Sequence, residues 1–253
     1  MDLKSGYPYW AVKNGLLHAF PPLQDDVRCD VAVLGAGITG ALIADELAGH
    51  GHDVVVVDRR DAAWGSTSAS TALLQYEIDT HMADLARMYG EDDAALAYRA
   101  CLDAIGLLAE RTRGFRDIGF AFMSSLYFAS RKRHVRDLRE EYALRRRHGF
   151  DVRWLDPGEI AERYGFAAPC ALLSAVAARV DPYRLTYRLL ARLQRDGAGV
   201  FDRTDIEAIE VGPRSVVLRT PHGARIVARH VVVAGGYESQ SLLRQQMADN
   251  RSS

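Results

Sequence analysis

The sequence predicts an α/β fold: a Rossmann-like domain with a parallel βαβ sheet, interrupted by a smaller α+β region. An apolar run ends in a glycine-rich turn near residue 35, and helical patterns between about 81 and 179 separate this unit from a β-rich final third. The 253 residues are 48% hydrophobic and 26% charged, as in ordinary globular proteins. The net charge of −1 gives no reason to expect a nucleic acid as partner.

The glycine-rich turn directly follows the first predicted strand. Residues 30–34 form a short β-rich run that leads into Gly35-Ala36-Gly37-Ile38-Thr39-Gly40, which matches the pattern G-x-G-x-x-G. In this pattern the first glycine permits a tight turn, the second lets the backbone approach a pyrophosphate, and the third lets the next helix pack close to the strand. That helix is expected over about residues 39–48, with its N-terminal amides directed at the phosphates.

A second predicted strand, residues 53–57, ends at an acid. Asp58 lies where a pair of ribose hydroxyls needs a bidentate acceptor, with 17 residues between Gly40 and Asp58. Strand, turn, helix, strand and acid in this order favour an adenine dinucleotide over a βαβ unit without a nucleotide. Asp58 alone suits NAD as well as FAD. Residues 65–71 then form a loop rich in hydroxyl groups.

Other features of the sequence limit the classes of protein to which the chain can belong. Residues 1–28 predict an irregular arm whose aromatic side chains pack onto the domain or onto a partner subunit. They contain no apolar signal-peptide core, and no run approaches the roughly 18 apolar residues of a membrane span. Cys29, Cys101 and Cys170 are scattered, so we expect neither a disulfide framework nor a zinc site, and a cytoplasmic location fits.

The middle of the chain changes from helical to strand periodicity. Two helices broken near Gly90 are predicted over about 81–113, and two strands around a turn at Ser124-Ser125 over 119–130. A charged helix over 131–148, a strand over 151–155 and a helix from Asp156 to about Tyr164 follow. Acidic residues are interleaved with the arginines of the 131–148 helix, which indicates a solvated face rather than a nucleic-acid site.

The final third is rich in strands. Asp181-Pro182 begins a helix that ends before Gly197. Strands are predicted over 200–202, 206–211, 216–220 and 224–227, with a hairpin turn at 221–223. A last buried strand, 231–234, ends at Gly235-Gly236, where backbone can again come close to a ligand.

Four blocks resemble the FAD-dependent amine and amino-acid oxidoreductases of the D-amino-acid oxidase type, the group that includes glycine oxidase and sarcosine oxidase. The blocks are the glycine pattern with Asp58, the loop 65–70, the helix start at 180–182 with the strand through Ile206, and residues 233–237. The resemblance implies an FAD-binding domain made of 29–80 and 180–240, an inserted substrate-domain region over 81–179, the arm 1–28 and a truncated tail 241–253.

The resemblance also implies which residues hold the cofactor. The pyrophosphate would be held by the turn, Asp58 would bind the adenosine ribose with Arg59 beside the adenosine, and Ile206 would present backbone groups to the adenine. Ser66 and Thr67 would contact the phosphates, Ser70 and Thr71 would lead toward the flavin, and Gly235 would lie against the dinucleotide. The full implied set is Gly35, Gly37, Ile38, Thr39, Gly40, Asp58, Arg59, Ser66, Thr67, Ser70, Thr71, Ile206 and Gly235.

The implied chemistry is oxidation of the C–N bond of a small amine or amino acid by hydride transfer to flavin, for which no general base is required and no catalytic residue is assigned. The chain stops at Ser253, before the family's last substrate-domain segment and flavin-side glycine block. We therefore expect a C-terminally truncated member, with a non-catalytic dinucleotide-binding module and a nicotinamide-dependent dehydrogenase as the alternatives.

Five further residues have two interpretations each. Tyr76 and Tyr127 are candidates for a pocket, with ordinary packing preferred. His50-x-His52 has the spacing of two metal ligands, but an exposed turn is favoured and no metal is predicted. Cys29 precedes the first strand and is expected to be a small buried residue rather than a flavin anchor.

Overall fold

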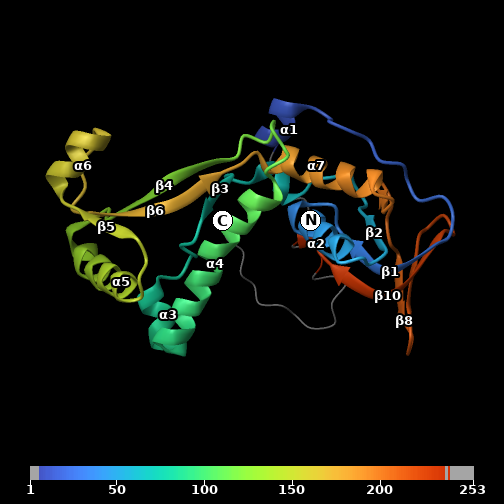
Figure 1. The fold of residues 1–253 in the computed structure, drawn as a ribbon. Coiled ribbons are helices and arrows are strands. Elements are labelled where there is room, and N and C mark those ends of the chain that lie inside the picture. Colours follow the sequence, from blue (N-terminus) through green and yellow to red (C-terminus); the bar gives the residue numbers. More distant parts are fainter. Residues whose placement is uncertain (1–5, 237–238, 240–253) are drawn as a thin grey trace. The chain divides into compact units, whose positions relative to one another are not determined.

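The computed structural model describes residues 6–236 and 239. The chain divides into two compact units, the first made of residues up to Thr71 and from Asp181 onward, the second of Ala72–Val180 (Figure 1). The second unit begins at residue 72 rather than at 81, because the short strand that follows Ala72 pairs within the second unit.

The first unit is built on a six-stranded sheet with the order β7-β2-β1-β10-β9-β8. The first four of these strands are mutually parallel, and β9 and β8 continue the sheet in antiparallel fashion. The strands are β1 (Val27–Leu34), β2 (Val54–Val57), β7 (Gly199–Phe201), β8 (Ala208–Val211), β9 (Val216–Arg219) and β10 (Arg225–Val233). All four valines of β2 are buried, as expected for an interior parallel strand.

Two long helices pack together in the first unit. Helix α2 (Ile38–Gly49) follows β1, and α7 (Pro182–Arg195) begins at Asp181, whose side chain accepts a hydrogen bond from the Arg184 N–H at 3.0 Å. The Arg192 guanidinium of α7 grips the Asp45 carboxylate of α2 through two hydrogen bonds of 2.9 and 2.7 Å. This bidentate pair, with Asp45 buried, fixes the two helices to each other.

The predicted arm contains a short helix, α1 (Tyr9–Asn14), so the expectation of a wholly irregular arm is wrong. Its aromatic residues pack onto the first unit: the Trp10 indole donates to the Ser70 carbonyl at 2.9 Å, and Tyr7 contacts Trp64 edge to face. A 3-10 turn, η1 (Ser66–Ala69), lies within the hydroxyl-rich loop.

Two predicted strands near the end of the chain form one strand. Residues 224–227 and 231–234 were expected to be separate, but β10 is continuous, since it pairs with β1 from Ile226 to Val233. The polar residues Arg229 and His230 occupy exposed positions within this strand and do not interrupt it. Its last three valines are half-buried rather than buried.

The second unit has a four-stranded antiparallel sheet flanked by helices. β6 is its central strand and pairs with β4 on one side and with β3 and β5 on the other. The strands are β3 (Leu73–Gln75), β4 (Ala121–Phe128), β5 (Val152–Leu155) and β6 (Ala171–Arg179). The helices are α3 (Met82–Tyr89), α4 (Glu91–Arg111), η2 (Lys132–His134), α5 (Val135–Arg147) and α6 (Pro157–Tyr164).

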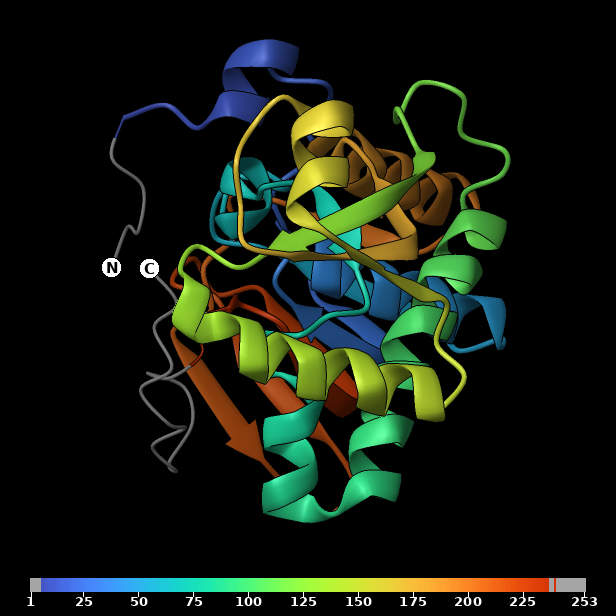
Figure 2. The same cartoon turned by 90° about the vertical axis from the view of Figure 1, so that its left-hand side faces the viewer.

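The predicted break between α3 and α4 is confirmed at Gly90, whose φ of +99° ends one helix and starts the next (Figure 2). The prediction of α6 is confirmed as well: Asp156 and Glu159 form a reciprocal capping box. The prediction of two strands around Ser124-Ser125 is wrong. β4 is one strand, and the serines mark a shift of register between Met123 and Ser125.

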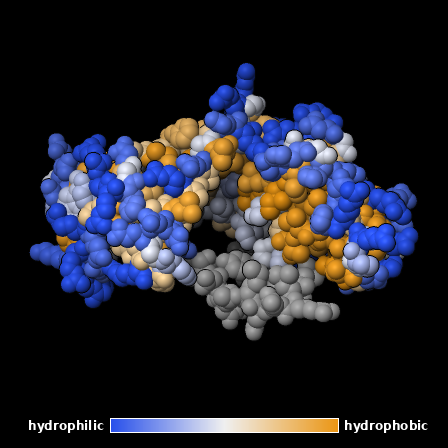
Figure 3. Space-filling model, turned by 60° about the horizontal axis from the view of Figure 1, so that its bottom comes forward, coloured by the Kyte–Doolittle hydropathy of each residue, from blue (hydrophilic) through white to orange (hydrophobic). Residues whose placement is uncertain are grey.

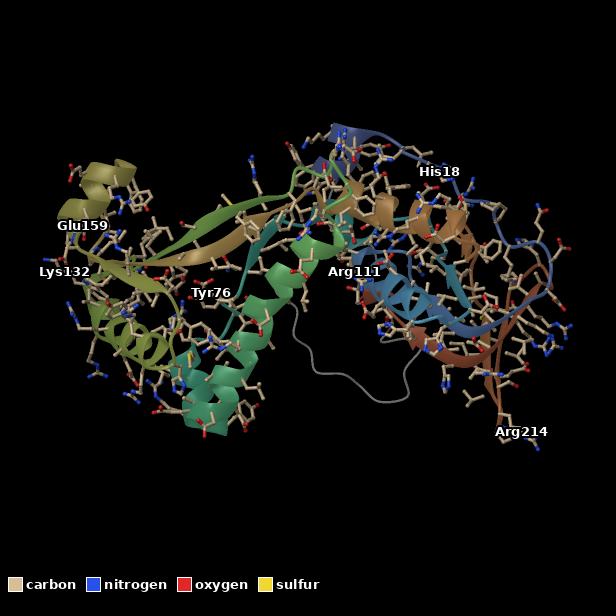
Figure 4. The ribbon with its side chains drawn as sticks, in the orientation of Figure 1. His18, Tyr76, Arg111, Lys132, Glu159 and Arg214 are labelled. Carbon is tan, nitrogen blue, oxygen red and sulfur yellow. The ribbon has the colours of Figure 1, made fainter. Side chains whose placement is uncertain are left out.

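Arg145 is an exception to the predicted solvated face of α5. Its side chain is 1% exposed, with Nη2 2.7 Å from Glu141 Oε1 and Nη1 3.2 Å from Glu77 Oε1. Glu141 is itself fully buried and accepts the N–H groups of Met82 and Ala83 at the start of α3. The helix therefore contributes an ionic cluster to the interior of the second unit, beside Tyr76, which is buried there (Figure 4).

Candidate functional site

The glycine turn lies at the carboxyl end of β1, the third strand of the sheet of the first unit. The Gly35 N–H donates to the Val57 carbonyl at the end of β2, at 2.8 Å, and the Ala234 N–H donates to the Leu34 carbonyl at 2.7 Å. These two hydrogen bonds connect the carboxyl ends of β1, β2 and β10 at one edge of the sheet. The chain leaves β1 through α2 toward β2, whereas β10 lies on the opposite side of β1, so the turn occupies a topological switch point.

At two of the three glycine positions of the turn there is no room for a Cβ atom. Gly35 has a φ of +116°, and a Cβ there would lie 2.6 Å from the Ala234 carbonyl oxygen. A Cβ on Gly40 would lie 1.8 Å from the Gly35 carbonyl oxygen. The first glycine thus allows the turn to pass the end of β10, and the third lets α2 begin directly against the turn.

Gly37 is the N-cap of α2, and no side chain of its own caps the helix. The Ile38 N–H donates to Thr67 Oγ1 at 2.9 Å, and a Cβ on Gly37 would lie 3.2 Å from the same oxygen. Thr67 is buried, so its hydroxyl is a fixed part of the helix start. Within the described part of the chain the Gly37 N–H has no hydrogen-bond partner. The start of α2 therefore has both a bare glycine and an available amide, which suit an anion.

Asp58 faces the glycine turn. Its Oδ2 accepts the Ala36 N–H at 2.7 Å, and its Oδ1 accepts the Arg60 N–H at 2.9 Å. The side chain is half-buried. Two backbone amides thus hold the carboxylate in one orientation beside the glycine turn.

Ala63 is a residue of this site that the sequence did not reveal. Its N–H donates to the Ala36 carbonyl at 3.0 Å, and its φ is +59°, a left-handed conformation that is unusual for alanine. The two peptide groups that flank Ala36 are therefore held, the first by Asp58 and the second by Ala63. No sequence pattern marks a positive φ at an alanine, so only the small size of Ala62 and Ala63 hinted at close packing.

The hydroxyl-rich loop is only partly brought to the turn. Thr67 contacts it directly, whereas Ser66, Ser70 and Thr71 are exposed, and the Ser70 carbonyl is engaged by Trp10. The aromatic content of the arm predicted that Trp10 packs onto the domain, but no pattern in the sequence indicated its hydrogen bond to Ser70. Arg59 is exposed beside Asp58, and Thr39 is exposed on the first turn of α2.

The last two predicted cofactor-binding residues are Gly235 and Ile206, which lie next to different strands of the sheet. The backbone of Gly235 follows β10 and closely approaches Gly35, whose Cβ would lie 2.9 Å from the Gly235 nitrogen. Ile206 precedes β8 and packs against the core of the first unit, and its N–H donates to the Asp205 carboxylate at 3.0 Å. In the same loop the Thr204 N–H donates to the Asp58 carbonyl at 2.8 Å, which ties this segment to the end of β2.

The other candidate residues lie elsewhere. Tyr76 is 1% exposed, stacks on Phe150 and donates to Ser174, so packing describes it. Tyr127 is half-exposed and contacts His81. Cys29 lies on β1, where burial and the nearby Asp53 raise the pKa of its thiol to about 11.

The histidines His50 and His52 are exposed just after α2. In the residues that the structure describes, no group of three or more His, Cys, Asp and Glu side chains is arranged to hold a metal ion. Among the same residues, none of the helices combines the length and the apolar character needed to cross a bilayer.

Comparison with known proteins places this site in context. A family model described as FAD dependent oxidoreductase matches residues 30–252. Glycine oxidase of Geobacillus kaustophilus is 31% identical over 216 residues, 83% of this chain and 55% of the relative. A putative Rieske 2Fe-2S iron-sulfur protein of Bacillus subtilis is 25% identical over 252 residues, 96% of this chain and 48% of that protein.

A solved structure gives the same result for the fold. The crystal structure of glycine oxidase from Geobacillus kaustophilus matches with a TM-score of 0.72 and 26% identity, over 85% of this chain and 57% of the other. The chain spans about half the length of the curated relatives it matches.

Proposed function

Because this chain belongs to the FAD dependent oxidoreductase family, we propose that its first unit holds FAD at the glycine turn and that the protein oxidises the C–N bond of an amine or amino acid. The observation that carries the proposal is the arrangement of Gly37 and Asp58. The fixed carboxylate accepts the Ala36 N–H, and the next residue, Gly37, is the bare start of the helix. This pair of groups suits a ligand with a diphosphate and a ribose.

The start of α2 would hold the pyrophosphate. The Gly37 amide and the first amides of the helix, those of Thr39 and Gly40, point toward an anion at the positive end of the helix dipole. Since Thr67 Oγ1 accepts the Ile38 N–H, the Thr67 hydroxyl proton is left to donate to a phosphate oxygen. Ile38 would then act indirectly, by orienting Thr67 rather than by binding phosphate itself.

The end of β2 would hold the adenosine. Asp58 would accept hydrogen bonds from the two ribose hydroxyls, and the exposed Arg59 would lie beside the adenosine. The Ile206 N–H is engaged by Asp205, so this residue would offer its carbonyl to the adenine. Gly235 would leave room for the dinucleotide next to Gly35.

The loop 65–71 would serve the flavin half of the cofactor, with Ser66 near the phosphates and with Ser70 and Thr71 toward the ring. Trp10 would stabilise this loop through its hydrogen bond to Ser70. Residues 72–180 would take the role of a substrate domain.

Bound flavin supplies the chemistry by accepting a hydride equivalent from the carbon next to nitrogen. The chain's own contribution is to bind and orient the cofactor through rigid backbone groups, because both glycines 35 and 40 and the Ala36 peptide are fixed by their neighbours. The substrate class is supported by the similarity of this chain to glycine oxidase. All three cysteines are free thiols, which supports a cytoplasmic location as part of the proposal.

The experiment uses the purified 253-residue chain. Its visible absorption spectrum is recorded after addition of FAD and removal of the excess, and the sample is then mixed anaerobically with a panel of amino acids and amines. We expect a flavin spectrum that at least one amine bleaches. A flavin spectrum that no compound bleaches supports the non-catalytic module instead, and binding of NADH without FAD would contradict the proposal.

A further inference from the structure

β4 is the open edge of the sheet in the second unit. β6 has β4 on one side along the whole length of the strand and has β3 and β5 on the other. Within the described residues no strand pairs with the outer edge of β4. None of its eight residues is buried, and Phe122, Tyr127 and Phe128 are 63%, 45% and 47% exposed. Hydrophobic residues of the second unit are also visible at its surface in Figure 3.

This edge lacks the charged residues and the proline that commonly protect an edge strand. Exposed edge strands commonly carry charges or proline, which prevent pairing with other strands. From Gly119 to Ser130 the sequence contains no charged residue and no proline. An uncharged edge of this length offers its unpaired N–H and C=O groups to another strand.

The shift of register in β4 decides which side chains share a face. Phe122 and Tyr127 pair with Ala178 and Leu172 of β6, whereas Met123 and Leu126 pair with Ala177 and Leu173. Since alternate residues of β6 point to opposite faces, Phe122 and Tyr127 lie on one face of the sheet and Met123 and Leu126 on the other. The shift sets Ser124 opposite two residues of β6, Ala175 and Val176. In a regular strand Phe122 and Tyr127, which are five residues apart, would point to opposite faces.

The same shift makes the strand complementary to itself. A two-fold axis between Ser124 and Ser125 places Phe122 opposite Tyr127, Met123 opposite Leu126 and serine opposite serine. Each of the two apolar pairs then lies on a single face of a continuous sheet. We propose that β4 pairs antiparallel with β4 of a second copy of this chain and joins two sheets into one.

The surface available fits a reversible dimer. With the three exposures above, and with about 150–250 Å² for a fully buried aromatic side chain, each copy leaves on the order of 300 Å² of aromatic surface at this strand. Two copies would bring about 600 Å² of it together. Because side chains stand off the two faces of a paired sheet, only part of this area would be covered, which is less than in obligate dimers. The dimer is therefore concentration-dependent.

Another extended polypeptide would also fit an open edge, including a segment from the part of the relatives that this chain does not span. An unrelated strand would not require side chains that match about the Ser124–Ser125 axis. The matched order therefore favours a second copy of β4 as the partner. The two occupants differ in outcome: the second copy gives a dimer of the purified chain, and the other leaves a monomer.

The first test is sedimentation equilibrium of the purified chain over a dilution series, for the wild type and for Phe122→Lys. Phe122 is 63% exposed, so the variant should keep its circular dichroism spectrum. In a dimer of this variant each of the two paired strands would bury one lysine. This should weaken self-association by about tenfold or more. The control is Arg214→Ala, at the exposed tip of the β8–β9 hairpin of the first unit (Figure 4), which should leave it unchanged.

The second test does not depend on the folding of that variant. Ser124→Cys places two thiols beside the proposed axis, and mild oxidation should link two copies faster than it links wild type or Arg214→Cys. A monomeric wild type at all concentrations would overturn the proposal. So would a dimer that Phe122→Lys does not weaken while its circular dichroism is retained, or cross-linking of Ser124→Cys no faster than that of the controls.

Discussion

The Asp58 carboxylate receives the Ala36 N–H at 2.7 Å, so the acid that ends β2 also fixes the glycine turn that ends β1. One side chain thus has a structural contact and a proposed contact with the ligand. Its two roles can be separated by substitution, because they need different atoms and different measurements.

Replacement of Asp58 should affect both roles. Asp58→Ala removes the acceptor of the Ala36 and Arg60 amides, and a hydrogen bond to a charged group contributes about 1.5–3 kcal/mol. We expect FAD affinity to fall by about tenfold to a hundredfold, as measured by quenching of flavin fluorescence. Asp58→Asn keeps one acceptor oxygen and should unfold at a higher temperature than Asp58→Ala, while still binding FAD more weakly than wild type. Wild-type affinity in Asp58→Ala would contradict the assignment.

The glycines should respond to alanine in a graded order. Gly40→Ala places a Cβ 1.8 Å from backbone and should prevent correct folding, seen as loss of soluble protein. Gly37→Ala meets only Thr67 Oγ1, at 3.2 Å, and should fold but bind FAD more weakly because the methyl group occupies the phosphate approach. Gly49→Ala is the control within the same helix, since nothing lies within 4 Å of its Cβ. Equal FAD affinity for Gly37→Ala and Gly49→Ala would refute this role of Gly37.

The buried ion pair in the second unit should matter for stability. Glu141→Ala leaves Arg145 with only Glu77 as a buried ionic partner and frees two amides at the start of α3. We expect a loss of about 3–5 kcal/mol in the free energy of unfolding, measured with urea. The control is Arg147→Ala, which breaks an exposed pair with Glu91 and should cost less than about 1 kcal/mol. Similar losses in both variants would show that burial of the pair does not matter.

Cys29 should make stability fall at high pH. Burial and nearby Asp53 raise the pKa of its thiol from 9.0 to about 11, so the folded state holds this proton after the unfolded state has lost it. The contribution is complete below pH 9 and is lost as the pH rises through 11. Cys29→Ser should lose less stability than wild type over this range, as followed by denaturant midpoints. Parallel curves for the two proteins would contradict the shift.

The local parts of the fold were predictable because their signals are contiguous in sequence. The turn at Gly35–Gly40, the break at Gly90 and the cap at Asp156 each depend on residues within a few positions of one another. The hydrogen bond from Ile38 to Thr67 and the contact of Trp10 with Ser70 join residues far apart, so no local pattern reveals them.

The errors have physical causes as well. β6 was not predicted because alanine has low strand propensity, and four of its nine residues are alanine. The serines of β4 resembled a turn, but the pairing with β6 keeps the strand extended around them. Arg145 lies in a run of three arginines, and only the buried carboxylates of Glu141 and Glu77 distinguish it from its exposed neighbours.

The most direct test of the account is calorimetric titration of the purified chain with FAD, FMN and NAD. If the Gly37 helix start binds the diphosphate and Asp58 the adenosine ribose, FAD should bind at a single site and FMN should bind at least about tenfold more weakly because it lacks both groups. NAD, which has both groups but no flavin ring, should bind more weakly than FAD. Equal affinity for FAD and FMN, or binding of NAD in preference to FAD, would contradict it.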